Sequence, residues 1–131
     1  MKPIETVQTF YSLFGQGRIP ELLEDLVAPD AVLENRLPAP IPFGGSFEGR
    51  EGFARYLERI LAGISIESFE IDEILADGDR VVVIGRETSL VRETGKRYTM
   101  DWVHVLRVSE GRVVHMREYN DTAAMHEAFL A

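Results

Sequence analysis

A histidine and a glutamate stand fourteen residues apart in the last third of the chain, at His104 and Glu118. In an apolar pocket such a pair can take up and return a proton, as general acid–base catalysis requires. Arg86 could clamp an anion or a carbonyl oxygen beside them. These three residues are the first candidates for catalysis.

Each candidate also has a purely structural explanation. His104 and Glu118 could form a hydrogen-bonded network in a pocket that only binds, because titratable groups in pockets are not always functional. Arg86 could neutralise Glu118, since buried charges are normally paired. Trp102 is expected to be a wall of the pocket rather than a specific contact. Both explanations stay open at this point.

Four apolar, strand-like segments would position these side chains. The loops between the later ones, Glu93–Gly95 and Ser109–Gly111, have the form of three-residue hairpin loops with glycine in the left-handed position. The sequence therefore predicts an antiparallel meander of strands over residues 65–75, 80–91, 97–108 and 112–119.

The two loops also predict how these strands pair. They set Arg86 opposite Trp102, and Trp102 opposite Glu118. The adjacent rows are Ile84, His104 and Met116 on one side, and Thr88, Met100 and Asn120 on the other. All these positions are even-numbered, so they share one face of the sheet, because side chains alternate with a period of two. That face would be apolar with an ionisable cluster at its middle, and a one-residue error in either loop would scatter the cluster.

The opposite face of the predicted sheet is also apolar, and it would carry Val81, Val83, Val103, Val105, Val113 and Tyr119. A sheet that is apolar on both sides needs both sides covered. Three helices cover only one face well, so we expect the other face to mediate a homodimer.

Helical spacing of apolar residues predicts helices over residues 3–14, 20–27 and 51–62, with a short strand over 31–36. Phe10 and Tyr11 on the first helix are expected to line the pocket, and Tyr11 and Tyr56 read as core residues rather than catalytic ones. The segment 37–49 is rich in proline and glycine but also apolar, which favours a lid. Asp121 is expected to cap a last helix over 122–130.

Composition limits the classes of function. The chain has 131 residues, enough for one domain over 1–131, and a net charge of −8 that disfavours nucleic acid as a partner. It has no cysteine, and its three histidines do not converge, so neither a metal nor another cofactor is expected. No segment reads as a signal peptide or a membrane span, so we expect a cytoplasmic protein without membrane contact.

Two motifs and the order of elements resemble a known family. The motifs are Gly44-Gly45-Ser46-Phe47-Glu48-Gly49-Arg50 at the entry to a helix, and Gly111-Arg112-Val113-Val114-His115-Met116-Arg117-Glu118-Tyr119-Asn120-Asp121 at the end of the sheet. They resemble the SnoaL-like branch of the nuclear transport factor 2-like superfamily, which includes ketosteroid isomerases, polyketide cyclases and limonene epoxide hydrolase. The resemblance spans nearly the whole chain. It implies an α+β fold whose N-terminal helices pack on a strongly curved antiparallel sheet to form a cone-shaped pocket.

The resemblance to three enzyme groups is unequal. The tyrosine, base and acid of the ketosteroid isomerases would fall at Phe10, Asn35 and His104, and the first two differences argue against that mechanism. The histidine and acid of the polyketide cyclases match His104 and Glu118 in spacing, with glutamate in place of the more usual aspartate. This is the best match of the three.

Limonene epoxide hydrolase is similar at Asn35, Arg86 and Glu118. This resemblance implies that Asn35 is a fourth catalytic candidate, which could hold a water or a substrate oxygen, although Asn35 could also simply end a strand. The second aspartate of limonene epoxide hydrolase falls at Thr88, however, and its water-binding tyrosine falls at Leu33, so the usual pair of carboxylates is incomplete.

The sequence therefore predicts a cofactor-independent acid–base enzyme of the isomerase, cyclase or dehydratase type, acting on a small apolar carbonyl-type metabolite. An epoxide hydrolase and a non-catalytic binding module are the alternatives. The expected ligand contacts are Trp102, Met100, Met116, Ile84, Thr88, Asn120, Phe10 and Tyr11.

Overall fold

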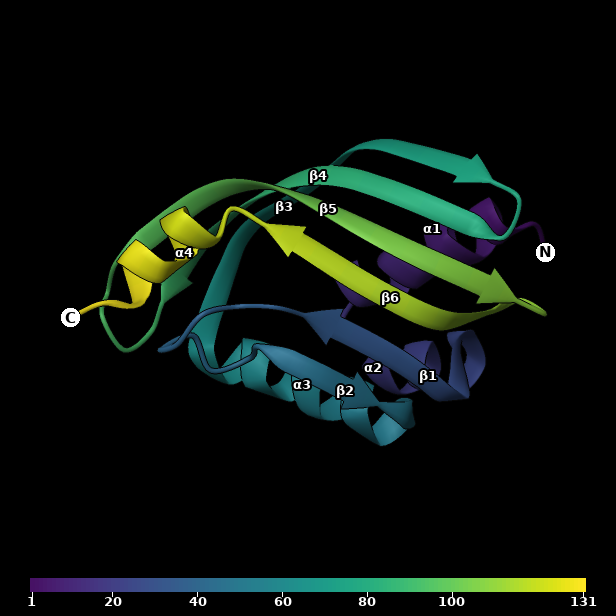
Figure 1. Cartoon of the computed structure of the whole chain (residues 1–131), viewed down its shortest axis with the longest axis horizontal. Helices are drawn as coiled ribbons and strands as arrows, with labels where there is room; N and C mark the ends of the chain where they lie inside the picture. Colours follow the sequence, from purple (N-terminus) through teal and green to yellow (C-terminus); the bar gives the residue numbers. More distant parts are fainter.

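The computed structural model describes all residues from Met1 to Ala131. Helices and strands follow the predicted order, with helices first and a strand meander after them (Figure 1). The elements are α1 (Pro3–Gly15), α2 (Ile19–Glu21), the π-helical turn η1 (Leu22–Leu26), β1 (Val27–Asn35), β2 (Gly45–Glu48), α3 (Gly49–Gly63), β3 (Ile64–Asp77), β4 (Arg80–Val91), β5 (Arg97–Ser109), β6 (Arg112–Asn120) and α4 (Thr122–Phe129).

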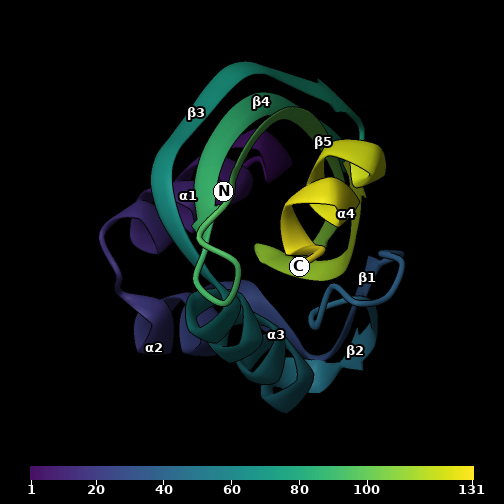
Figure 2. The same ribbon diagram turned by 90° about the vertical axis from the view of Figure 1, so that its left-hand side faces the viewer.

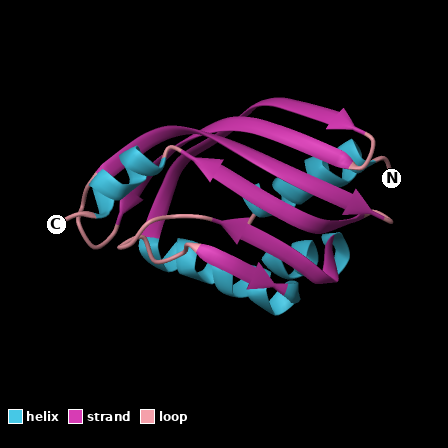
Figure 3. Ribbon diagram, in the orientation of Figure 1, coloured by secondary structure: helices cyan, strands magenta, loops and turns pink.

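The six strands form one sheet in the order β2-β1-β6-β5-β4-β3. All neighbours are antiparallel except β1 and β6, which run parallel (Figure 3). Figure 2 shows β3, β4 and β5 arching over α1, with α3 on the far side of the interior and α4 at one end. The fold is therefore α+β, as predicted, with a mixed but mostly antiparallel sheet.

The local signals in the sequence explain where the helices begin. Pro3 occupies the first turn of α1, where its missing N–H costs nothing, and the Glu5 carboxylate accepts a hydrogen bond of 2.8 Å from the backbone N–H of Lys2. Asp121 caps α4 by accepting a hydrogen bond of 3.1 Å from the backbone N–H of Ala124.

Strand β2 lies inside the segment 37–49 that was expected to be only loop, and it forms a hairpin with β1.

The predicted pairing of β4 with β5 is wrong by one residue. Val91 donates a backbone hydrogen bond of 2.8 Å to the carbonyl of Lys96, so the connecting loop is one residue longer than predicted. Gly85 therefore lies opposite Trp102, and Arg86 lies opposite Asp101. Because the side-chain period is two, this single step moves the even-numbered residues of β4 to the outer face.

The predicted pairing of β5 with β6 is wrong by two residues, which keeps the predicted face. Glu110 and Gly111 both have positive φ and form a two-residue turn, because Ser109 already pairs with Arg112. A β-bulge between Arg107 and Val108 adds the second step. As a result His104 lies directly opposite Glu118 rather than diagonal to it.

These differences in strand pairing also change which apolar residues lie on each face of the sheet. Val81, Val83 and Val113, which were expected on the outer face, are completely buried in the core. Val103, Val105 and Tyr119 remain on the outer face as predicted, and they are joined there by Val82 and Ile84. The sheet is therefore apolar on both sides, as predicted. On β4, however, the residues that were predicted to face inward face outward, and those predicted to face outward face inward.

Gly85 is the position that lets the large ring of Trp102 lie against β4. A Cβ atom at Gly85 would stand 2.3 Å from Cζ2 of Trp102 and 2.3 Å from the carbonyl oxygen of Glu70. Trp102 is only 1% exposed, and its ring stacks on His104 at 4.1 Å and on Phe69 at 4.8 Å between ring centroids. A glycine inside a strand often marks such a close approach.

Gly85→Ala should therefore lower the free energy of unfolding by about 2–3 kcal/mol, because the new methyl group has to displace either the indole ring or the backbone of β3. Urea denaturation followed by tryptophan fluorescence measures this change. Gly15→Ala is the matched control, since a Cβ there meets nothing within 4 Å. Equal stabilities of the two variants would contradict the packing described for Gly85.

Candidate active site

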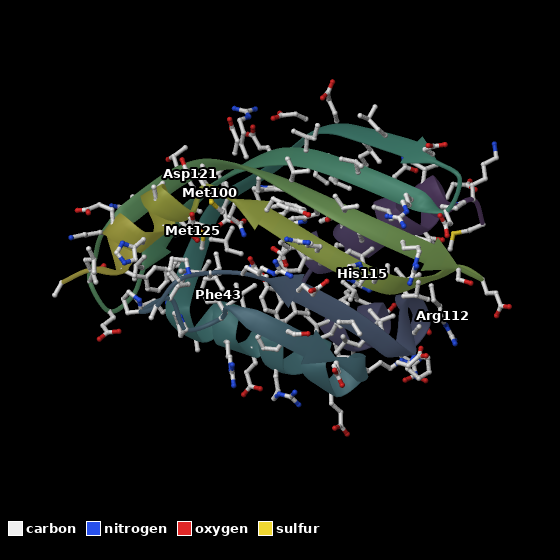
Figure 4. All side chains as sticks on the ribbon, in the orientation of Figure 1. Phe43, Met100, Arg112, His115, Asp121 and Met125 are labelled. Carbon is white, nitrogen blue, oxygen red and sulfur yellow. The ribbon has the colours of Figure 1, made fainter.

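An apolar cavity of about 60 Å³ lies between the sheet and the helices α1 and α3. A single water needs roughly 10–15 Å³ by the same kind of measure, so the cavity as built holds only a small molecule. In Figure 4 the labelled lining residues Phe43, Met100 and Met125 come from the segment after β1, from β5 and from α4. Sixteen of the 21 lining residues are hydrophobic, and none is a lysine or an arginine.

The structure brings His104 and Glu118 together on one wall of this cavity. Nε2 of His104 is 3.1 Å from Oε1 of Glu118, and the two side chains are only 6% and 9% exposed. Trp102 does not line the cavity; it lies behind His104 and stacks on the imidazole. The pair is therefore shielded from solvent and held in one orientation.

Tyr11 completes this first cluster from helix α1. Its hydroxyl is 2.6 Å from Nδ1 of His104. Burial, and then the charge of Glu118, raise the pKa of Tyr11 well above its ordinary value, so the phenol keeps its proton. When the phenol donates its proton to Nδ1, Nδ1 acts as an acceptor and the proton of the neutral imidazole lies on Nε2. The Nε2–H group then donates a hydrogen bond to Glu118. Tyr11 was expected to be a core residue, and it is one, but its hydroxyl also sets the state of His104.

Asn35 and Asn120 form a second set of polar contacts beside Glu118. Nδ2 of Asn35 donates to the hydroxyl of Tyr56 at 2.8 Å, and Nδ2 of Asn120 donates to Oδ1 of Asn35 at 2.9 Å. Asn35 is 2% exposed and pairs with Glu118 across β1 and β6. Burial raises the pKa of Tyr56. The charge of Glu118 and a hydrogen bond between Tyr56 and Glu118 raise it further. Both ends of the Asn35 amide are thus occupied by protein groups.

Glu87 is a second carboxyl in the cavity, and the sequence analysis missed it. It is 9% exposed, and its Oε2 accepts hydrogen bonds of 2.8 Å from both Ser89 Oγ and Tyr98 Oη. Burial raises the pKa of Glu87 and outweighs these two hydrogen bonds, with the charge of Glu118 as a smaller contribution. A neutral carboxyl can donate a hydrogen bond, which an ionised one cannot. Gly85 in the middle of β4 was the signal that could have fixed the correct face.

Arg86, Ile84 and Thr88 are not part of the site, contrary to the prediction. The shifted pairing of β4 with β5 places them on the outer face. Arg86 is 55% exposed and forms ion pairs with Glu70 at 2.7 Å and Asp72 at 3.1 Å. Thr88 is hydrogen-bonded to Thr99 at 2.9 Å. Arg86 therefore neither clamps a ligand in the cavity nor neutralises Glu118, and both predictions for it are wrong.

The remaining expected contacts lie at the cavity, except Trp102, which was predicted to be a wall of the pocket and lies behind His104 instead. Phe10 and Tyr11 line the cavity from α1, Met100 from β5, and Met116 and Asn120 from β6. No group of three or more histidine, cysteine, aspartate or glutamate side chains is arranged to hold a metal ion. None of the helices is long and apolar enough to span a membrane. The cavity thus holds two carboxyl groups with different hydrogen-bond partners in an apolar space, an arrangement that can support acid–base chemistry.

The fold and the apolar cavity between its sheet and helices are those of a nuclear transport factor 2-like protein, and the comparisons agree. The family model described as the SnoaL-like domain matches residues 7–116, so the chain belongs to the SnoaL-like family. No curated protein sequence matches the chain.

Solved structures of this fold resemble the chain over nearly its full length. A nuclear transport factor 2-like protein from Burkholderia xenovorans LB400 is 30% identical to this chain. The alignment covers 98% of this chain and 95% of that protein, with a TM-score of 0.87. A Bacillus subtilis protein provisionally assigned as an isomerase is 25% identical, with coverages of 95% and 90% and a TM-score of 0.79. TerC, co-crystallised with polyporic acid, is 26% identical, with coverages of 96% and 96% and a TM-score of 0.79.

The raised pKa of Glu87 makes the stability of the protein depend on pH. Its carboxyl ionises more easily in the unfolded chain than in the folded one. The stability that it contributes is therefore complete below the ordinary glutamate value of about 4.3, and it is lost as the pH rises toward the folded-state pKa. Glu87→Gln should thus gain stability relative to the wild type as the pH rises above about 4.3.

Urea denaturation of both proteins at several pH values measures this difference. Glu58→Gln, at an exposed position on α3, is the control and should follow the wild type at every pH. A Glu87→Gln curve parallel to the wild type would mean that Glu87 is not buried as described.

Proposed function

We propose that this protein is a cofactor-independent acid–base enzyme of the isomerase, cyclase or dehydratase type, acting on a small, neutral, apolar carbonyl compound. The observation that carries the proposal is the presence of two carboxyl groups in one apolar cavity. Glu118 is hydrogen-bonded to His104, whereas Glu87 is held by Ser89 and Tyr98. Pairs of titratable groups in such different environments divide the roles of acid and base between them.

In this mechanism Glu118 removes a proton from the carbon next to the substrate carbonyl. His104 donates from Nε2 to Glu118 and keeps the carboxylate oriented, and Tyr11 fixes the imidazole from the other side. Glu87 in its neutral form donates a hydrogen bond to the carbonyl oxygen, where negative charge develops as the proton leaves. The proton then returns to a different carbon in an isomerisation, or a leaving group departs in a dehydration.

The lining of the cavity supports a neutral substrate. Its polar groups include two carboxyls, and it offers no lysine or arginine to balance the charge of an anion. A charged ligand would also lose its hydration in this apolar space without compensation. Related structures are consistent with a small-molecule role: the Bacillus subtilis relative is provisionally an isomerase, and TerC was crystallised with polyporic acid.

A second candidate function is epoxide hydrolysis, and Glu87 favours it specifically. The second carboxyl that epoxide opening needs, which the sequence resemblance placed at Thr88, is supplied one residue earlier by Glu87. Glu118 would then activate a water and Glu87 would protonate the epoxide oxygen. Against this, Leu33 offers no hydroxyl for the water, and the amide of Asn35 is already occupied on both sides.

Exchange of the α-protons of cyclohexanone in heavy water, followed by NMR, tests the first candidate without knowledge of the natural substrate. The protein should accelerate this exchange, and Glu118→Gln should reduce the acceleration by roughly 10²–10⁴-fold because the base is lost. Glu87→Gln keeps a hydrogen-bond donor and should cost less. Arg86→Ala, outside the cavity, should exchange at the wild-type rate. An equal effect of Glu118→Gln and Arg86→Ala would contradict the mechanism.

Turnover of cyclohexene oxide in ¹⁸O-labelled water separates the second candidate from the first. If epoxide hydrolysis is the activity, the diol should carry one labelled oxygen, and both Glu118→Gln and Glu87→Gln should abolish its formation. Diol formation without α-proton exchange would favour the hydrolase over the isomerase type.

A binding module without catalysis is the remaining alternative. Cyclohexanone would then bind equally well to the wild type, Glu118→Gln and His104→Ala, while neither exchange nor diol formation exceeds the rate without protein.

A further inference from the structure

Asn120 offers the cavity a hydrogen-bond acceptor that the proposed mechanism does not use. It lines the cavity at the end of β6 and is partly buried, next to Asp121, which Figure 4 labels. Its Nδ2 donates to Oδ1 of Asn35 at 2.9 Å, whereas its Oδ1 accepts no hydrogen bond from the protein. The fully enclosed side-chain atoms without a partner are Thr6 Oγ1 and Trp102 Nε1, so Oδ1 of Asn120 is not sealed off. It can therefore accept a hydrogen bond from a bound molecule.

The direction of each hydrogen bond around Asn120 follows from Glu118. In the proposed mechanism Glu118 is an ionised carboxylate, which only accepts, so the hydroxyl of Tyr56 donates its one proton to Glu118. That hydroxyl then has to accept from Asn35, whose Nδ2 lies 2.8 Å away. Oδ1 of Asn35 is consequently an acceptor, and Asn120 has to present Nδ2 to it. Hydrogen-bond networks of this kind decide which end of an amide is the oxygen, and here the free end of Asn120 is Oδ1.

The pairing of the strands places this acceptor between the two carboxyl groups of the cavity. Glu118 and Asn120 are two residues apart on β6, so both side chains face the cavity and their Cα atoms lie roughly 7 Å apart. Asn120 pairs with Trp102, which pairs with Gly85. Glu87 lies two residues beyond Gly85 on β4. The row of Asn120 therefore lies between the rows of Glu118 and Glu87, and a ligand that contacts both carboxyl groups passes it.

We infer that Oδ1 of Asn120 binds a hydroxyl group of the substrate, so that the substrate is a hydroxylated carbonyl compound. The inference rests on the proposed function, which places the carbonyl oxygen at Glu87 and the reacting carbon at Glu118. A ligand held at these two carboxyl groups presents its hydroxyl group to Asn120, in the row between them. Asn120 is then a specificity-determining residue and takes no part in proton transfer.

An amide oxygen distinguishes ligands by the hydrogen-bond donors that they carry. A hydroxyl group donates to it, whereas a methyl group of similar size, an ether and a second carbonyl group do not. A ligand without the donor leaves Oδ1 of Asn120 unpaired once water has been displaced, and this loss weakens its binding. A site built to bind a hydroxyl group therefore rejects the analogue that lacks it.

Ligand-observed NMR titration measures this preference without turnover. The probes are 3- and 4-hydroxycyclohexanone, each compared with the methylcyclohexanone that carries a methyl group in place of the hydroxyl group. At least one hydroxyketone should bind the wild type on the order of tenfold more tightly than its methyl counterpart. Asn120→Leu should remove this preference and still bind the methyl ketones, which also shows that the variant is folded. Thr88→Val, which removes a hydroxyl group from the outer face, is the control and should keep the preference.

Tyr56→Phe tests the hydrogen bonds that orient Asn120. This variant keeps Oδ1 of Asn120 but removes the hydroxyl that holds the amide of Asn35 in one direction. Both amides are then free to reverse, so the preference for the hydroxyketone should fall while the methyl ketones bind as before. Equal weakening of the hydroxyketones and the methyl ketones would contradict the orienting role of Tyr56.

The titration separates this inference from the proposed function, because binding is measured independently of α-proton exchange. Equal affinities of the wild type for hydroxyketones and methyl ketones, or a preference that survives in Asn120→Leu, would overturn the inference even if exchange is found. A preference that depends on Asn120 in a protein that catalyses no exchange would support the hydroxyl site and contradict only the proposed catalysis.

Discussion

The positions of the side chains in the cavity depend on the contact between Trp102 and Gly85. The indole ring takes the space that any side chain at position 85 would need, so the observed pairing of β4 with β5 requires glycine there. This pairing turns the odd-numbered residues of β4 inward and thereby brings Glu87 and Ser89 to the cavity. The same ring supports the imidazole of His104 by stacking on it at 4.1 Å.

A largely apolar cavity accepts polar side chains only if they are hydrogen-bonded, because unpaired polar groups are costly to bury. The structure meets this condition with two separate clusters. Tyr11, His104 and Glu118 form one, and Glu87, Ser89 and Tyr98 form the other. A cluster that contains an imidazole and a cluster that contains only hydroxyl donors hold their carboxyl groups differently. The proposed division of acid and base roles between the two carboxyl groups rests on this difference.

Periodicity and glycine positions are local signals, so the sequence was sufficient for the α+β class and for the order of all elements except β2. The resemblance to the SnoaL-like family depended on two motifs, and the match of the family model confirms it. The sequence also placed His104 and Glu118 on the same face of the sheet. The predicted pairing of β5 with β6 was wrong by two residues, and a shift of two residues leaves each side chain on its predicted face. The prediction failed for Arg86 and Glu87 because the length of one hairpin loop decides which face of β4 is inside. Loop length and the bulge at Arg107 depend on tertiary packing, which a single sequence does not display.

The central claim is that burial raises the pKa of Glu87 beside the His104–Glu118 pair, so that Glu87 keeps its proton to a higher pH than an ordinary glutamate. Infrared spectroscopy of the protein in heavy water over a series of pH values tests this directly, because a protonated carboxyl absorbs apart from carboxylates and amides. In the wild type we expect one such band to persist as the pH rises above the ordinary glutamate value of about 4.3, to be lost in Glu87→Gln and to remain in Glu58→Gln. Loss of all protonated-carboxyl absorption at the ordinary glutamate value, or a band that survives in Glu87→Gln, would contradict it.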